Sequence, residues 1–227
     1  VIEDTAQAIG ADYTFADGKK QKAGTIGIIG CTSFFPSKNL GCYGDGGAIF
    51  TNDDSLAGKL RMIANHGQSV QYVHDSIGVN SRLDSIQAAI LRIKLRHLDE
   101  YAVARNKAAD YYDNAFKNNP KIVTPARAKN SNHVFHQYTL QLKGVQNPSE
   151  MRNKLKDYLA TKDIPMMIYY PIPLHMQKAY TDPRYKAGDF PVTEHLCSCV
   201  FSLPMQTELS EDQLKYITNS VLEYINL

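Results

Sequence analysis

Two residues of opposite charge follow apolar, strand-like runs and could perform chemistry together. Asp4 ends the run of residues 1–4, and Lys38 stands just after the run of residues 31–35, in a turn that opens with Pro36. α/β proteins place ligand groups at the carboxyl ends of strands. A lysine in an apolar turn between Ser37 and Asn39 can act as a nucleophile toward aldehydes.

A carboxylate and a lysine at neighbouring strand ends are what pyridoxal 5'-phosphate (PLP) chemistry requires. The lysine forms the Schiff base with the cofactor, and the carboxylate keeps the pyridine nitrogen protonated so that the ring accepts electrons. Taken one at a time, the two residues have ordinary interpretations. A loop lysine is usually solvated, and an aspartate after a strand is commonly a helix cap.

The elements that must position these residues can be predicted from turn residues and periodicity. We expect strands over residues 1–4, 31–35 and 48–51, with a turn-rich hairpin or meander over 12–30 and a glycine-rich turn over 41–47. Asp53 or Asp54 is expected to cap a helix that runs to about Asn65.

The longest helical pattern covers residues 81–117. Its apolar positions repeat at spacings of three and four, at Leu83, Ile86, Ile90 and Ile93. Beyond Pro120 and Pro125 the pattern changes to a strand over 136–142 and helices over 149–161 and 210–226. We therefore predict a domain of residues 1–115 and a smaller α+β domain of residues 116–227.

The composition excludes several classes of function. The chain has 227 residues, 43% hydrophobic and 21% charged, with a net charge of +2 and no basic run, so neither nucleic acid nor a membrane surface is expected as a partner. No apolar run reaches the length of about 20 residues that a bilayer span requires. The four cysteines have neither disulfide-scaffold nor zinc spacing, so we expect reduced thiols, no metal and a cytoplasmic protein.

Four blocks of sequence together carry a family resemblance. They cover residues 1–11, 32–48, 80–91 and 170–175, and the second reads TSFFPSKNLGCYGDGGA. In these blocks and their order the chain resembles the DegT/StrS family of sugar aminotransferases. The resemblance implies an α/β protein of PLP-dependent transferase fold type I: the C-terminal part of the large domain, followed by a small α+β C-terminal domain.

The resemblance also assigns roles by matching position. Lys38 would be the Schiff-base lysine and proton shuttle, Asp4 would pair with the pyridinium nitrogen, and Gln7 would lie by the ring hydroxyl. Ser33 would bind the cofactor phosphate, and Asn80 would reach the phosphate of the other subunit's cofactor in a homodimer with shared active sites. The substrate contacts, with the nucleotide sugar or the donor carboxylate, would come from Arg82, Tyr169 and Tyr170.

Several of these residues have a structural alternative. Gln7 could satisfy local backbone groups, and Ser33 could be an ordinary strand-end hydroxyl. Arg82 could form a salt bridge at the start of a helix, with Asn80 as the helix cap. At Tyr169 many relatives have histidine, which would change a sugar contact from imidazole to phenol.

The second block has the version Pro-Ser-Lys-x-Leu-Gly-Cys-Tyr-Gly-Asp-Gly-Gly. This version is similar to enzymes that aminate the 3-keto group of a UDP-linked sugar uronate, with glutamate as the donor, for polysaccharide or O-antigen precursors. A 4-keto deoxysugar nucleotide is the close alternative. Two other classes remain: a PLP sugar dehydratase of the same fold, which has histidine in place of Lys38, and a non-catalytic truncated or regulatory homologue.

The start of the chain leads to one further expectation. It opens inside an apolar run, and nothing in it matches the front half of the family's large domain, which supplies a phosphate-binding turn and a ring-stacking aromatic residue. We therefore expect residues 1–227 to belong to a longer protein and to be inactive alone.

Overall fold

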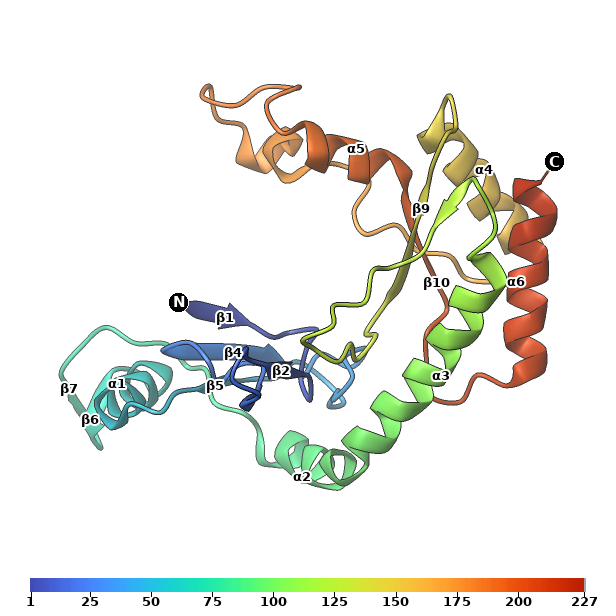
Figure 1. Cartoon of the computed structure of the whole chain (residues 1–227). Coiled ribbons are helices and arrows are strands. Elements are labelled where there is room, and N and C mark those ends of the chain that lie inside the picture. Colours follow the sequence, from blue (N-terminus) through green and yellow to red (C-terminus); the bar gives the residue numbers. More distant parts are fainter. Residues whose placement is uncertain (227) are drawn as a thin grey trace. The chain divides into compact units, whose positions relative to one another are not determined.

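A computed structural model describes residues 1–226 and divides the chain into two compact units (Figure 1). Unit 1 comprises Val1–Val103 and Arg127–His136, and unit 2 comprises Ala104–Ala126 and Gln137–Leu227. The boundary falls inside one continuous helix, α3 (Leu98–Phe116). Because that helix contributes to both units, the domain division at residues 1–115 and 116–227 stays a prediction.

Unit 1 is built on a three-stranded sheet in the order β1-β4-β5 (Ile2–Asp4, Ile29–Ser33 and Gly47–Phe50). β1 and β4 are parallel, whereas β4 and β5 are antiparallel. β4 begins and ends two residues earlier than the predicted strand of residues 31–35. It ends at Ser33 because the hydroxyl of Ser33 accepts a hydrogen bond from Phe35 N at 3.2 Å, and Pro36 next in sequence has no N–H to donate.

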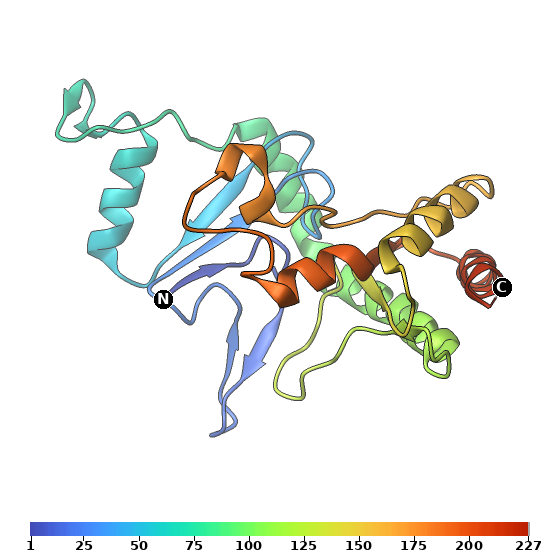
Figure 2. The same cartoon turned by 90° about the horizontal axis from the view of Figure 1, so that it is seen from above.

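Two of the predicted elements near this sheet are confirmed. The turn-rich stretch contains the antiparallel hairpin β2–β3 (Asp12–Thr14 and Lys20–Lys22), which projects from the sheet in Figure 2. Helix α1 (Asp54–Ala64) begins after Asp53, whose carboxylate accepts from Leu56 N at 3.0 Å. A short hairpin, β6–β7 (Gln68–Val70 and Val73–His74), follows α1 and was not expected.

The long helical pattern is not one helix. It consists of α2 (Ser85–Lys94), a 3₁₀ turn η1 (Leu95–His97) and then α3. Residues 81–84 are not helical, because the chain is still extended at Asp84, the residue that precedes α2. Asn80 is therefore not the helix cap.

The apolar stripe predicted for this helix does not face the interior of the unit. Ile86 is 75% exposed and Ile93 is 62% exposed, while Leu91, outside the predicted stripe, is buried. The buried cluster of unit 1 joins α2 and the start of α3 to the segment that follows β4; its members are Phe34, Leu40, Cys42, Leu91 and Leu98.

Unit 2 packs helices onto an antiparallel sheet of order β10-β9-β8 (Val200–Leu203, Tyr138–Leu142 and Ile122–Val123). Helices α4 (Pro148–Ala160) and α6 (Glu211–Ile225) lie side by side in Figure 1 and confirm the two predicted helices. α6 begins with a capping box between Ser210 and Gln213. The 3₁₀ turns η2 (Leu174–Met176) and η3 (Lys178–Tyr180) precede α5 (Pro191–Cys199).

The interior of unit 2 contains several aromatic side chains, and the hydroxyls of Tyr112 and Tyr138 are both hydrogen-bonded. The ring of Tyr112 lies 4.9 Å from that of Tyr138, and the hydroxyl of Tyr112 donates to Pro204 O at 2.8 Å. Tyr138 donates to Asp113 at 2.6 Å. Burial raises the pKa of Tyr112 far above its ordinary value, so this phenol stays protonated. In the described residues 1–226, we find no helix that has both the length and the apolar character to cross a membrane.

Candidate active site

The parallel pairing of β1 and β4 aligns the carboxyl ends of two strands. Asp4, the last residue of β1, is opposite Cys31 in β4, and β4 ends two residues later at Ser33. Asp4 and Ser33 therefore leave the sheet at the same edge, where α/β proteins bind ligands. Gln7, exposed, follows Asp4 in the turn that leaves β1.

Local hydrogen bonds orient the Asp4 carboxylate. Its Oδ1 accepts from Ala6 N at 3.0 Å, which forms an Asx turn, and the residue is exposed. The next residue, Thr5, is buried and bonds to Cys31 O through both its N–H (2.7 Å) and its hydroxyl (2.8 Å). Thr32 returns a hydrogen bond to Thr5 O at 3.1 Å. These threonines hold the two strand ends together, a role that was not predicted from the sequence.

Glu3 is a further residue near this edge that was not predicted from the sequence. Its carboxylate accepts from three backbone N–H groups, those of Gly24 (2.8 Å), Ile26 (2.7 Å) and Gly27. Partial burial raises the pKa of Glu3, but the three donors outweigh that effect and hold the pKa below its ordinary value. Glu3 thus ties residues 24–27 to the strand that carries Asp4.

The hydroxyl of Ser33 is oriented in the same way. Its oxygen accepts from Phe35 N, and its own O–H can still donate to an anion. A donor of this kind at a strand end suits a phosphate oxygen.

Lys38 stands in the loop of residues 36–46, which we call the lysine loop. A turn from Phe35 to Lys38 is closed by Lys38 N donating to Phe35 O at 2.8 Å, and Lys38 is half-buried. The loop returns to β4 because Cys42 N donates to Phe34 O at 2.8 Å. Gly41 is required there, since a Cβ at this position would overlap the backbone oxygen of Pro36.

The residue after Lys38 fixes the loop to another part of unit 1. Asn39 is buried, and its Nδ2 donates to Val134 O at 2.8 Å. Because Asn39 and Leu40 are both buried, the backbone on the carboxyl side of Lys38 is held at two successive residues.

Asn80 and Arg82 lie on a different part of unit 1. Both are exposed, and they belong to residues 75–84, which connect the β6–β7 hairpin to α2. Asn80 forms a β-bridge with Asn65, the residue that ends α1, and Arg82 Nη1 donates to Asn65 Oδ1 at 3.1 Å. Asn65 therefore contacts both predicted ligand residues.

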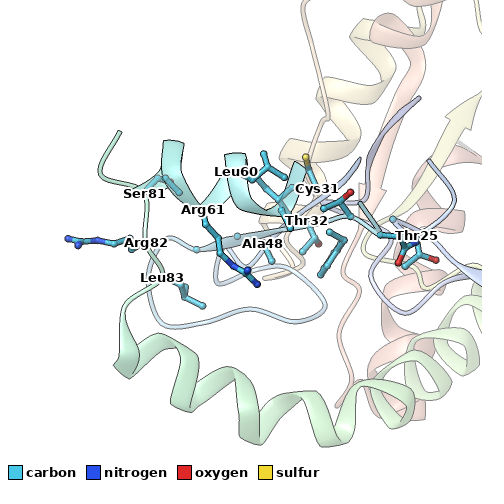
Figure 3. A pocket seen from close by; sticks show the side chains of 18 of the residues that line it. Thr25, Cys31, Thr32, Ala48, Leu60, Arg61, Ser81, Arg82 and Leu83 are labelled. Atoms are coloured by element: carbon cyan, nitrogen blue, oxygen red, sulfur yellow. The ribbon is translucent and has the colours of Figure 1, made fainter. Parts of the chain in front are cut away.

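A hollow of about 980 Å³ lies between α1, β5 and residues 81–84 (Figure 3). Arg61 extends from α1 toward its centre, whereas Arg82 points away from it. Asp4, Ser33 and Lys38 are not among the lining residues. The structure thus brings Asp4, Gln7, Ser33 and the Lys38 loop to one edge of the sheet, but it does not bring Asn80 and Arg82 into contact with them.

Tyr169 and Tyr170 belong to unit 2. They follow Met167, which pairs with Ser202 of β10 through hydrogen bonds of 3.1 and 2.8 Å. Their rings meet edge to face with centroids 5.6 Å apart, and Tyr170 is 66% exposed. The phenol of Tyr170 is thus available to a ligand, while Tyr169 is half-buried.

Residues 1–222 match the model of the DegT/DnrJ/EryC1/StrS aminotransferase family. The chain belongs to this family. Its resemblance to the family in four sequence blocks is thereby confirmed, and so is its fold, since it aligns with solved members as a mixed α/β segment of the type I aminotransferase fold.

Two relatives within the family show what this chain is similar to. It is 43% identical over 217 residues to "UDP-2-acetamido-2-deoxy-3-oxo-D-glucuronate aminotransferase" of Pseudomonas aeruginosa, covering 96% of this chain and 56% of that protein. It is also 43% identical over 226 residues to the "Pleiotropic regulatory protein" of Geobacillus stearothermophilus, covering 99% and 58%. The chain thus spans little more than half the length of these curated relatives.

Two proteins of this fold have been solved with a ligand or cofactor. S. venezuelae DesV, "in complex with ketimine intermediate", is 36% identical, with a TM-score of 0.89, and the match covers 100% of this chain and 58% of DesV. A Streptococcus pneumoniae protein that is 22% identical (TM-score 0.87, covering 99% and 57%) has been solved in its PLP-form, and also in a PMP-form. Homologous structures therefore bind PLP or PMP.

Proposed function

We propose that the protein containing this chain is a PLP-dependent aminotransferase that transfers an amino group to a keto sugar nucleotide. One observation carries the proposal: the parallel β1–β4 pair brings a carboxylate (Asp4), a hydroxyl (Ser33) and the loop of a primary amine (Lys38) to one edge of the sheet. These groups suit the ring nitrogen, the phosphate and the aldehyde of PLP, so the residues present fit the cofactor.

When bound, PLP supplies an aldehyde carbon and an electron-accepting ring for amino transfer. The residues of this chain would then act as follows. The amine of Lys38 would bind the cofactor covalently and, once released by the incoming amino donor, carry the proton between the cofactor carbon and the substrate carbon. The Asx turn of Asp4 would aim a carboxylate at the pyridinium N–H, and Ser33 would donate its O–H to the phosphate. Gln7, in the turn after Asp4, would lie by the ring hydroxyl.

For the substrate we propose a UDP-linked 3-keto sugar, with glutamate as the amino donor, in the synthesis of polysaccharide or O-antigen precursors. The relative from Pseudomonas aeruginosa, named for a 3-oxo-glucuronate substrate, supports this choice at 43% identity. Arg82, Tyr169 and Tyr170 are proposed to contact the nucleotide sugar or the donor carboxylate. A planar guanidinium suits either anion because it donates two parallel hydrogen bonds. The cytoplasmic location expected from the composition stays a prediction.

We further propose a homodimer in which Asn80 reaches the cofactor phosphate of the partner subunit. The support is a set of large apolar side chains that are exposed on the β6–β7 hairpin, on the residues after it and on α2 of unit 1. They are Val70, Tyr72, Ile77, Ile86 and Ile93. Because exposed apolar side chains of this size are often covered in an assembly, we expect a second copy to bury part of this set.

A regulatory role is the second candidate, because the Geobacillus stearothermophilus relative is named a regulatory protein. The presence of Lys38, Asp4 and Ser33 together favours catalysis, since a non-catalytic homologue has no use for the full set. Lys38 also argues against the sugar dehydratase, which has histidine at this position.

The test uses the whole gene product, supplied with PLP, glutamate and a UDP-linked 3-keto sugar. We expect formation of the amino sugar together with an equal amount of 2-oxoglutarate, and loss of both products in Lys38→Ala. A 4-keto sugar nucleotide aminated faster than the 3-keto sugar would contradict the substrate assignment. No product from wild type would contradict the enzyme assignment and favour the regulatory role. Equal product from wild type and Lys38→Ala would contradict the role assigned to Lys38.

A further inference from the structure

The lysine loop is held by one face of helix α2. Gln87, Leu91 and Lys94 stand at spacings of four and three, which places their side chains in one row along a helix. All three contact the residues that follow Lys38.

The central contact of this row is apolar. Leu91 is buried and belongs to the cluster that contains Phe34, Leu40 and Cys42. Leu40 and Cys42 lie on the carboxyl side of Lys38 in the loop, so α2 packs directly against the segment that carries the lysine.

The two outer contacts are polar and reach the backbone of the loop. Gln87 Oε1 accepts from Tyr43 N at 2.8 Å, and Lys94 Nζ donates to Gly41 O. The cation of Lys94 also lies 5.4 Å from the centroid of the Tyr43 ring. One side chain thus supplies the acceptor and the other the donor for backbone groups that a loop cannot pair within itself.

Helix α2 and the lysine loop are also in close steric contact. A Cβ added to Gly44 would lie 3.1 Å from Gln87 Nε2, which is tighter than ordinary contact. The loop is therefore built to receive a polar side chain from α2 at this position.

We propose that Gln87 and Lys94 are positioning residues for Lys38, acting through Tyr43 N and Gly41 O. This inference rests on the proposed function, in which Lys38 binds the cofactor. A catalytic group must be held close to its productive geometry by residues that do not themselves react. Loss of either polar contact should leave the loop in place through Leu91 but let the backbone around Lys38 move.

The variants separate a hydrogen bond from mere space filling. Gln87→Met keeps the length of the side chain but removes the acceptor, whereas Gln87→Glu keeps an acceptor for Tyr43 N. Lys94→Met removes the donor, whereas Lys94→Arg retains one for Gly41 O. Lys156→Met, an exposed lysine of α4 in unit 2, is the matched control.

Two measurements on the whole gene product make failure of this inference distinguishable from failure of the proposed function. Amide hydrogen exchange of the peptide that contains residues 38–46 reports the loop without any cofactor. The rate at which added PLP becomes fixed to Lys38 by borohydride reports the consequence for the lysine. If wild type forms no adduct on Lys38, the proposed function fails, while the exchange data still decide the positioning claim.

We expect Gln87→Met and Lys94→Met to raise exchange in this peptide and to slow adduct formation about tenfold. Gln87→Glu, Lys94→Arg and Lys156→Met should stay within about twofold of wild type. The inference is overturned if the methionine variants match wild type in exchange, or if Gln87→Glu is as impaired as Gln87→Met. It is also overturned if both methionine variants fail to fold while Lys156→Met folds, because the contacts would then serve folding rather than position.

Discussion

Asp4 pairs with Cys31 across the parallel strands β1 and β4, two residues before β4 ends at Ser33. This register puts a carboxylate and a hydroxyl at one edge of the sheet, immediately before the loop of Lys38. A shift of one residue would send Asp4 to the other face of the sheet, because side chains alternate along a strand. The register is therefore the feature on which the proposed PLP site depends.

Removing the Asp4 carboxylate should slow catalysis far more than it weakens substrate binding. Asp4→Ala and Asp4→Asn both lose the charge proposed to stabilise the protonated ring nitrogen. A lost preorganised group of this kind costs about 3–4 kcal/mol in the barrier, or roughly a factor of 10² to 10³ in kcat. Steady-state kinetics of the whole gene product should show this fall in kcat with little change in KM for the sugar nucleotide. Turnover near that of wild type would remove Asp4 from the proposed site.

The carboxylate of Glu3 should make the free energy of unfolding depend on pH at pH values below the ordinary pKa of a glutamate. The pKa of Glu3 is lowered from 4.5 in the folded chain, so its contribution is fully present above pH 4.5 and is lost as the pH falls through the lower, folded value. Glu3→Gln should lower the free energy of unfolding at pH 7 by about 1–3 kcal/mol, as for lost hydrogen bonds to a charged group.

The measurement for Glu3 is urea unfolding from pH 3 to pH 7, with Asp157→Asn, an exposed residue of α4, as the control. The difference between wild type and Glu3→Gln should shrink toward acid pH. A difference that stays constant over this range would mean that the charge of Glu3 is not what holds Gly24, Ile26 and Gly27.

Two glycine substitutions should have opposite effects. Gly41→Ala would drive a Cβ into Pro36 O and should destabilise the protein by about 1–3 kcal/mol, the usual cost of overpacking. Gly58, inside α1, has no atom within 4 Å of an added Cβ. Gly58→Ala should therefore stabilise it by about 0.5–1 kcal/mol through helix propensity. Thermal unfolding of both variants checks the signs, and a stabilising Gly41→Ala would show that the lysine loop is not packed as described.

Asn65 should matter for substrate binding through Arg82. Its side-chain oxygen accepts from Arg82 Nη1, so Asn65→Ala should let the guanidinium move. Loss of one hydrogen bond should weaken binding of the anionic substrate by about 1 kcal/mol and so raise its KM roughly fivefold. Asn65→Asp keeps the acceptor and should stay closer to wild type. Equal KM values for Asn65→Ala and wild type would indicate that the hydrogen bond does not position Arg82.

Local signals in the sequence predicted the elements that carry the site. Asp53 capping α1, the hairpin around Gly18 and the glycine-rich segment after Lys38 each follow from residue types that act within a few positions. Helices α4 and α6 of unit 2 were likewise placed to within one or two residues of their bounds.

The elements that were predicted wrongly or missed have two causes. One is tertiary packing, which local sequence does not show, and the other is an apolar segment that contains no turn residue. The periodicity of Leu83, Ile86, Ile90 and Ile93 predicted an amphipathic or buried helix. The residue of α2 that is buried in unit 1 is Leu91, which stands in a row with the polar Gln87 and Lys94. Periodicity alone cannot tell a stripe that covers its own core from one that a partner chain covers. Helix α5 and strand β10 were missed because an apolar run continues across their junction without a turn residue.

Within the site, the missed residues are those whose partners lie far away in sequence. Glu3 bonds to backbone groups 21 to 24 residues further along the chain, and Gln87 reaches Tyr43 across 44 residues. No spacing rule connects such pairs. The glycines at 24 and 27 were the available signal for Glu3, since closely spaced glycines let backbone N–H groups approach a carboxylate.

Mapping of the cofactor attachment point tests the central claim most directly. The whole gene product is loaded with PLP, reduced with borohydride, digested and analysed by mass spectrometry. We expect the pyridoxyl mass on the peptide that contains Lys38, at one label per chain, and no label in Lys38→Ala. A label on another lysine, or none on wild type under conditions that label a known PLP enzyme, would contradict the account.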